Sequence, residues 1–160
     1  MGIEIERKFR VKSEGWRHGS TSTVFRQGYL CSVPERTVRV RVAGESGFLT
    51  VKGRNQGATR AEFEYPIPRA DAEAMLATLC ERPLIEKTRH LLELRSHTWE
   101  IDVFAGENAG LVIAEVELER EDEAVVLPDW IGEEVTGDPR FQNSSLVAHP
   151  YRSWDAKDRR

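Results

Sequence analysis

The sequence predicts a mainly β (α+β) protein, in which about eight antiparallel strands form a closed barrel or a sandwich with a few flanking helices. Three observations support this prediction. Apolar and charged residues alternate through most of the chain, which is the pattern of strands with two different faces. Turn residues separate the alternating segments, as in antiparallel sheets. A clear helical period is confined to one segment.

The strands are defined by this alternation, and they contain many Val, Ile, Phe and Thr residues, which favour extended structure. The clear strand segments are residues 3–11, 37–42, 48–52, 61–67, 99–104 and 112–118. Residues 23–32 and 86–94 alternate less regularly and are weaker candidates. Segments 43–47 and 53–57 contain the glycines of two predicted hairpin loops.

One helix is predicted from a stripe of apolar residues with the spacing i, i+3, i+4, i+7 and i+8. The stripe consists of Ala72, Met75, Leu76, Leu79 and Cys80. Pro68 precedes this segment and Pro83 follows it, which agrees with a helix that is confined between them. We also expect a short helical turn at residues 122–126, and another that begins at Asn143 as the N-cap.

The length of 160 residues fits one domain, which we place at residues 1–152, followed by a frayed tail at 153–160. The net charge of −4 argues against broad nucleic-acid binding, which needs a basic surface. The sequence has no apolar run of membrane-spanning length and no signal-peptide pattern, so we expect a cytoplasmic protein that contacts no membrane. Cys31 and Cys80 form no metal-binding motif and are expected to be reduced thiols.

The charged residues of the strands are organised as like-charged pairs at positions i and i+2. The acidic pairs are Glu4 and Glu6, Glu62 and Glu64, Glu100 and Asp102, and Glu115 and Glu117; the basic pairs are Arg39 and Arg41, and Lys87 and Arg89. Lys8 and Lys52 lie singly in the same register. Such neighbours on one strand face are about 7 Å apart and repel by about 2 kcal/mol at an effective dielectric of about 20.

An ordinary barrel has an apolar interior and places its charged residues in water. Like-charged pairs on several strands would, however, be an unusual pattern for a solvent-exposed face. We therefore predict that the charged face points inward, with the apolar face covered by helices, loops or a second subunit. An eight-stranded barrel has room for one small ligand. Its bases would bind phosphate oxygens, and its acids would hold Mg²⁺ or Mn²⁺.

Eight short blocks along the chain resemble those of the CYTH superfamily, the triphosphate tunnel metalloenzymes. They are EIERKF (4–9), RQGYL (26–30), RVRV (39–42), TVKG (50–53), EFEY (62–65), EKTR (86–89), EIDVFAG (100–106) and AEVELE (114–119). The segment DWIGEEVTGDPRFQN (129–143) resembles the closing part of the compact bacterial members. The resemblance covers nearly the whole chain and implies a tunnel-shaped, closed eight-stranded barrel.

The resemblance also implies a role for each charged residue. The metal-binding carboxylates are Glu4, Glu6, Glu115 and Glu117, and the phosphate-binding residues are Lys8, Arg39, Arg41, Lys52 and Arg89. Further catalytic acids that place water or a second metal are Glu62, Glu64, Glu100 and Asp102. Lys87 and Tyr29 match a pair that activates water in compact bacterial members, although other members assign this step to a metal-bound carboxylate.

The expected activity is metal-dependent hydrolysis of inorganic triphosphate (tripolyphosphate) to pyrophosphate and phosphate, with Mg²⁺ or Mn²⁺ as cofactor. A class IV adenylyl cyclase and a thiamine-triphosphatase-like enzyme are alternatives on the same scaffold. A non-catalytic polyphosphate sensor is an alternative of another class. The sequence has no P-loop, GxSxG or HExxH motif. A homodimer is one way to cover the apolar outer face.

Overall fold

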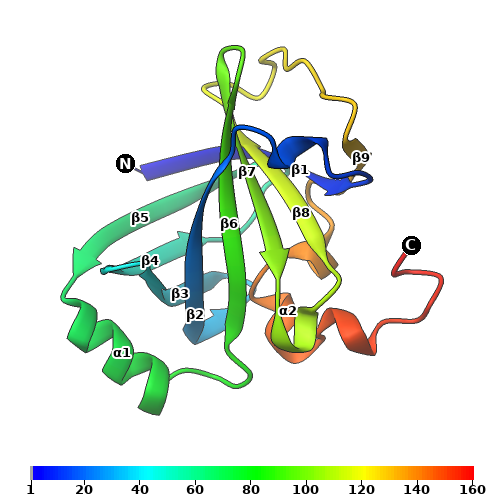
Figure 1. Cartoon of the computed structure of the whole chain (residues 1–160). Coiled ribbons are helices and arrows are strands. Elements are labelled where there is room, and N and C mark those ends of the chain that lie inside the picture. The colour runs from blue at the N-terminus through cyan, green and yellow to red at the C-terminus, as the bar shows by residue number, and fades with distance from the viewer. Residues whose placement is uncertain (1) are drawn as a thin grey trace.

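The computed structural model describes residues 2–160, and eight of its strands close into an antiparallel barrel, as predicted, rather than a sandwich (Figure 1). The barrel strands are β1 (Gly2–Val11), β2 (Thr21–Val33), β3 (Arg36–Ala43), β4 (Ser46–Gly53), β5 (Thr59–Ile67), β6 (Ile85–Leu94), β7 (His97–Phe104) and β8 (Val112–Glu117). Around the barrel they follow the order β5-β4-β3-β2-β6-β7-β8-β1, and a β5–β1 pairing completes the ring.

Strand β1 closes the barrel because its two halves have different partners. Residues 2–5 pair with β5, and residues 6–10 pair with β8. The end of β1 also pairs with a ninth strand, β9 (Ile131–Glu134), which the alternation did not reveal. The predicted hairpin at residues 43–47 is confirmed, since Ala43 lies opposite Ser46.

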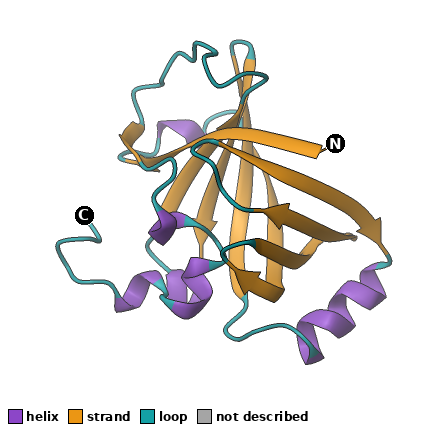
Figure 2. Ribbon diagram, turned by 180° about the vertical axis from the view of Figure 1, so that it is seen from behind, coloured by secondary structure: helices purple, strands orange, loops and turns teal. Residues whose placement is uncertain are grey.

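The predicted helix is α1 (Arg69–Thr78), which begins directly after Pro68. Ala72 and Leu76 of its apolar stripe are buried, as expected. The helix ends at Thr78, however, so Leu79 leaves the stripe and is 65% exposed. Figure 2 shows α1 standing apart from the other helices, at one end of the barrel.

Two smaller helix predictions need correction. Residues 122–126 form no helix, because the Glu123 carboxylate accepts hydrogen bonds from the Glu119 backbone N–H and from His97 and so holds an irregular turn. The helix near residue 143 is α2 (Ser145–Ala148), but its N-cap is Ser144 and not Asn143. The remaining helical turns are η1 (Gly15–Arg17), η2 (Gly106–Asn108), η3 (Pro139–Phe141) and η4 (Tyr151–Ser153).

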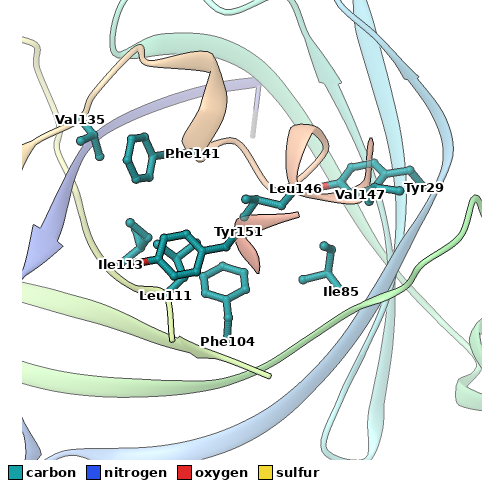
Figure 3. Packing of buried hydrophobic residues seen from close by; sticks show 10 residues of the cluster. All are labelled: Tyr29, Ile85, Phe104, Leu111, Ile113, Val135, Phe141, Leu146, Val147 and Tyr151. Atoms are coloured by element: carbon teal, nitrogen blue, oxygen red, sulfur yellow. The ribbon is translucent and has the colours of Figure 1, made fainter. Parts of the chain in front are cut away.

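The apolar face of the barrel points outward, and segments of the same chain cover most of it. Helix α1 covers Val40 and Val42 of β3, and η1 and the loop before β9 bring Trp16 and Trp130 onto β1, β7 and β8. The C-terminal segment covers the third region (Figure 3). That cluster contains Tyr29, Ile85, Phe104, Leu111, Ile113, Val135, Phe141, Leu146, Val147 and Tyr151. A barrel whose apolar face points outward can therefore still have a buried hydrophobic core, which lies between the strands and the segments that cover them.

Part of the outer face stays open on β1 and β5, where Ile3, Phe63 and Tyr65 are 68%, 40% and 56% exposed. A homodimer through such a surface stays a prediction.

At the other end of the chain, Trp154 packs against Phe141 and Tyr151. Cys31 and Cys80 are free thiols, as expected. Within residues 2–160, no helix has the length and apolar character that a membrane crossing needs.

Candidate functional site

The barrel encloses a cavity of about 230 Å³, and all predicted site residues except Asp102 line it. Asp102 lies directly beneath the lining and is 1% exposed. Strand periodicity produces this arrangement, because alternate residues point to the same face of a sheet. The register then sets opposite charges face to face: Lys8 lies opposite Glu115, and Arg89 lies opposite Asp102.

Lys87, Arg89 and Asp102 form a buried ion cluster on β6 and β7. The Lys87 Nζ atom donates to Asp102 Oδ2 at 2.7 Å. Arg89 binds the same carboxylate with two parallel hydrogen bonds of 2.8 Å each, and its Nη1 lies 2.6 Å from Glu100 Oε2. Asp102 is therefore held by two cations, and its role in placing water or a second metal stays a prediction.

The charge balance of this cluster explains its proton affinities. Burial raises the pKa of Asp102, but Arg89 and Lys87 outweigh it and hold that pKa below its ordinary value. Burial lowers the pKa of Lys87; Asp102 opposes this shift and Arg89 adds to it, so that the pKa is about 8. A lysine with such a pKa can act as a base near neutral pH.

A second group of ion pairs involves Glu4 and Lys52 on the opposite side of the ring. Lys52 Nζ lies 2.8 Å from Glu4 Oε2 and 2.9 Å from Glu62 Oε2, and Arg60 Nε lies 3.3 Å from Glu4 Oε2. Burial raises the pKa of Glu4, but Lys52 and Arg60 outweigh it and lower this pKa to about 2. Each cation here is held by carboxylates and can exchange them for phosphate oxygens.

Arg39 and Arg41 share one carboxylate, that of Glu64, at 3.7 Å and 3.1 Å. The Arg41 guanidinium also stacks over the rings of Phe25 and Phe48, at 4.8 Å and 5.2 Å from their centroids. The Nε atoms of both arginines are buried, and neither has a hydrogen-bond partner in the described part of the chain. Both arginines therefore have a buried donor that is unsatisfied in this arrangement.

Glu6 and Glu117 differ from the other acids, because no ion pair is formed by either one within residues 2–160. They lie directly opposite each other on β1 and β8. Burial and the neighbouring Glu115 raise the pKa of Glu6 well above its ordinary value. Burial, Glu4 and Glu62 raise the pKa of Glu117. Buried acids beside other carboxylates are costly to ionise unless a further cation is bound nearby.

These four neighbouring carboxylates, Glu4, Glu6, Glu115 and Glu117, fit a divalent metal ion by the chemistry of their donors, since Mg²⁺ and Mn²⁺ prefer carboxylate oxygens. As they stand, no three acidic, histidine or cysteine side chains of residues 2–160 converge closely enough to hold an ion. Glu4 and Glu115 are instead paired with Lys52 and Lys8. Metal ligation would require these carboxylates to leave their lysines.

Tyr29 lines the cavity, but no hydrogen bond joins it to Lys87 among the described residues. Its ring packs in the cluster of Figure 3, close to Leu146 and Val147. Lys87 donates instead to Asp102 and to Asn143 Oδ1, the latter at 3.0 Å. A Lys87–Tyr29 pair stays a prediction.

Several residues that line the cavity are not among the predicted site residues. They are Thr37, Arg60, Gln142, Asn143 and Ser144. Arg60 has the same strand parity as Glu62 and Glu64, so the alternation contains the signal for it. Residues 142–144 lie between η3 and α2, where no period exists, and their position depends on how the C-terminal segment packs on the barrel.

Comparison with known proteins agrees with this geometry. The CYTH domain family matches residues 2–151. An inorganic triphosphatase of Acetivibrio thermocellus is 49% identical over 154 residues, which cover 96% of this chain and 99% of the relative. An inorganic triphosphatase of Nitrosomonas europaea is 39% identical over 90% of this chain and 96% of its own length. The crystal structure of the inorganic triphosphatase NE1496 superposes with a TM-score of 0.66, at 36% identity over 90% of this chain and 93% of that chain.

Proposed function

Because the chain belongs to the CYTH family, we propose that it is a metal-dependent hydrolase that cleaves inorganic triphosphate to pyrophosphate and phosphate inside its barrel. The observation that carries this proposal is the lining of the cavity. Bases from five strands and carboxylates from four strands face one enclosed space of about 230 Å³. Relatives at 49% and 39% identity are inorganic triphosphatases.

Substrate binding is an exchange of partners. Each basic residue of the lining already holds at least one carboxylate, as the pairs of Lys8 with Glu115 and Lys52 with Glu4 show. A triphosphate would replace those carboxylates with its own oxygens. The phosphate-binding residues are Lys8, Arg39, Arg41, Lys52 and Arg89, to which Arg60 is added by its position. The released carboxylates are then free for the metal ion.

Glu6 and Glu117, joined by Glu4 and Glu115, would hold Mg²⁺ or Mn²⁺. The bound ion would neutralise these acids and take up charge that develops on the phosphate oxygens. Positioning and charge, rather than a covalent nucleophile, carry phosphoryl transfer. The acids Glu62, Glu64 and Glu100 would orient Lys52, Arg39, Arg41 and Arg89, because each is already paired with one or more of them.

Lys87 is the base that we assign to the attacking water. In its neutral form, the amine accepts a proton from water while the water oxygen bonds to the terminal phosphorus. The phosphoanhydride P–O bond breaks, and its electron pair leaves on pyrophosphate. Because Lys87 must be neutral, kcat/KM should rise as the pH increases through about 8.

The test is a phosphate-release assay with tripolyphosphate, performed with Mg²⁺, with Mn²⁺ and with a chelator. We expect one phosphate and one pyrophosphate per substrate molecule, and no turnover in the chelator. Binding of tripolyphosphate without turnover under every metal condition would favour the sensor and contradict the hydrolase.

A further inference from the structure

Asn143 lies in the cavity although it belongs to neither a strand nor the cap of a helix. The α2 N-cap is Ser144, so the Asn143 side chain has no role at the start of that helix. It faces the cavity from the segment between η3 and α2. Phe141 and Leu146 flank it and are 1% and 0% exposed, which fixes the backbone on both sides.

The orientation of the Asn143 amide is determined by Lys87. A lysine amine is a donor toward this group, so the Asn143 oxygen and not its nitrogen must face Lys87 Nζ at 3.0 Å. Gln27 Nε2 donates to the same oxygen, also at 3.0 Å. Gln27 is 0% exposed, so it cannot rotate away without a large rearrangement. Two donors thus hold one carbonyl oxygen in place.

The contacts of the Lys87 nitrogen leave one tetrahedral direction free. One direction is the bond to Cε, a second is the hydrogen bond to Asp102 Oδ2, and a third is the hydrogen bond to Asn143 Oδ1. A neutral amine has two N–H bonds and one lone pair. When oxygen acceptors hold both N–H bonds, the lone pair occupies the remaining direction. Because Lys87 lines the cavity, this lone pair is available to a group bound there.

We propose that Asn143 is a positioning residue for triphosphate hydrolysis, which holds one N–H of Lys87 while Asp102 holds the other, so that the amine lone pair is directed at the attacking water. This inference rests on the proposed function. The water proton passes to Lys87 Nζ, the water oxygen bonds to the terminal phosphorus, and pyrophosphate leaves with the electrons of the broken P–O bond. Asn143 itself neither gains nor loses a proton.

The charged groups that face Lys87 are Asp102 on β7, Arg89 on β6 and Glu115 on β8. Asn143 adds a neutral acceptor to this set, so it orients the amine without adding the negative charge that would favour the ammonium form. An aspartate at position 143 would orient the amine equally well but would hold its proton more tightly. A shift of the pH profile in the aspartate variant would therefore distinguish a residue that positions the Lys87 amine from one that only packs in the structure.

The experiment compares Asn143→Ala and Asn143→Asp with the wild type in pH profiles of kcat and kcat/KM for tripolyphosphate. We expect Asn143→Ala to lower kcat by about tenfold or more, with KM within about threefold of wild type. In Asn143→Asp, the inflection of kcat/KM should move to higher pH by about one unit or more. Above that pH, Asn143→Asp should regain a rate that Asn143→Ala does not.

Asn108→Ala is the structural control. Asn108 is 2% exposed; it accepts from the Tyr151 N–H at 2.8 Å and donates to the Leu146 carbonyl at 3.4 Å, so it anchors the same C-terminal segment without touching Lys87. We expect a lower melting temperature and an unchanged pH inflection. Wild-type kcat in Asn143→Ala, an unmoved inflection in Asn143→Asp, or the same kinetic changes in Asn108→Ala would each overturn the inference. Inactive wild-type protein would instead overturn the proposed function.

Discussion

The two sides of the cavity solve the problem of buried charge in opposite ways. In the cluster around Lys87, the charges of Lys87, Arg89 and Glu100 each have a partner of opposite sign within 3 Å, and the carboxylate of Asp102 binds two cations. Around Glu6 and Glu117, two carboxylates face each other across β1 and β8, and neither forms an ion pair in residues 2–160. The Lys87 side is thus a complete salt-bridge network, whereas the Glu6 side, which contains Glu6 and Glu117, lacks cationic partners among the described residues.

This difference indicates which groups change partners during function. Charges that are fully paired by the protein orient one another and hold a fixed geometry. Burial and neighbouring carboxylates raise the pKa values of Glu6 and Glu117, so both acids are costly to ionise unless a cation such as a divalent metal ion lies beside them. We infer that the Lys87 side is preorganised for proton transfer, whereas the Glu6 side is completed by the metal.

Asp102→Asn provides the strongest test of the paired side. The amide keeps the shape of the side chain but leaves Lys87 and Arg89 as buried cations without their shared counter-charge. We expect the free energy of unfolding to fall by about 3 kcal/mol in denaturant titrations. Glu35→Gln is the matched control, since Glu35 pairs with Arg54 at 2.6 Å where both side chains are more than half exposed, and its loss should cost less than about 0.5 kcal/mol. Equal stability of the two variants would show that pairing contributes little on this side.

Glu6→Gln tests the Glu6 side, where the substitution should lower activity without lowering stability. Removing one metal ligand should lower kcat/KM by at least about a hundredfold, or about 2.7 kcal/mol of barrier. Without metal, the unfolding free energy should be no lower than in the wild type, because the raised pKa of Glu6 favours its neutral form, and glutamine is neutral as well. Glu134→Gln, on β9 outside the cavity, is the control and should keep its activity. A Glu6→Gln variant with near-normal rates, or with clearly reduced metal-free stability, would contradict this assignment.

The barrel and its charged interior could be predicted from the sequence because both depend on a local rule, the alternation of side chains along a strand. The same rule also places Arg60 on the inner face, since it has the strand parity of Glu62 and Glu64 and lines the cavity. Asn143 is different, because its sequence context is typical of a helix cap. Its actual place depends on long-range packing of Phe141 and Leu146 against the barrel. No spacing along the chain reports such a contact.

The irregular loop at residues 122–126 gives a similar lesson. A polar run before Pro128 is compatible with a helical turn, but the Glu123 carboxylate bonds to the Glu119 backbone and to His97 of the neighbouring strand β7. These competing hydrogen bonds satisfy the backbone without a helix. Tertiary contacts therefore determine the structure at residues 122–126 and at Asn143, where the sequence alone predicts a helical turn and a helix cap.

The smallest expected effect concerns the substrate, which must reach both sides of the cavity at once. An inorganic triphosphate fits this demand because phosphate oxygens are its only recognition groups.

A nucleoside would have to extend from the barrel, since the one aromatic residue of the lining, Tyr29, is 4% exposed and packs against the C-terminal segment. The Asn143 amide oxygen is already held by Lys87 and Gln27, so it offers no acceptor to a base. We expect pyrophosphate to be a poor substrate, because it is shorter and has fewer oxygens with which to engage the metal side and the Lys87 side together. We expect kcat/KM for tripolyphosphate to exceed that for ATP by at least about tenfold, or about 1.4 kcal/mol, when phosphate release is measured for all three compounds with the same metal. Comparable rates with ATP, or cyclic AMP as its main product, would show that one side of the cavity suffices for binding and would favour the cyclase alternative.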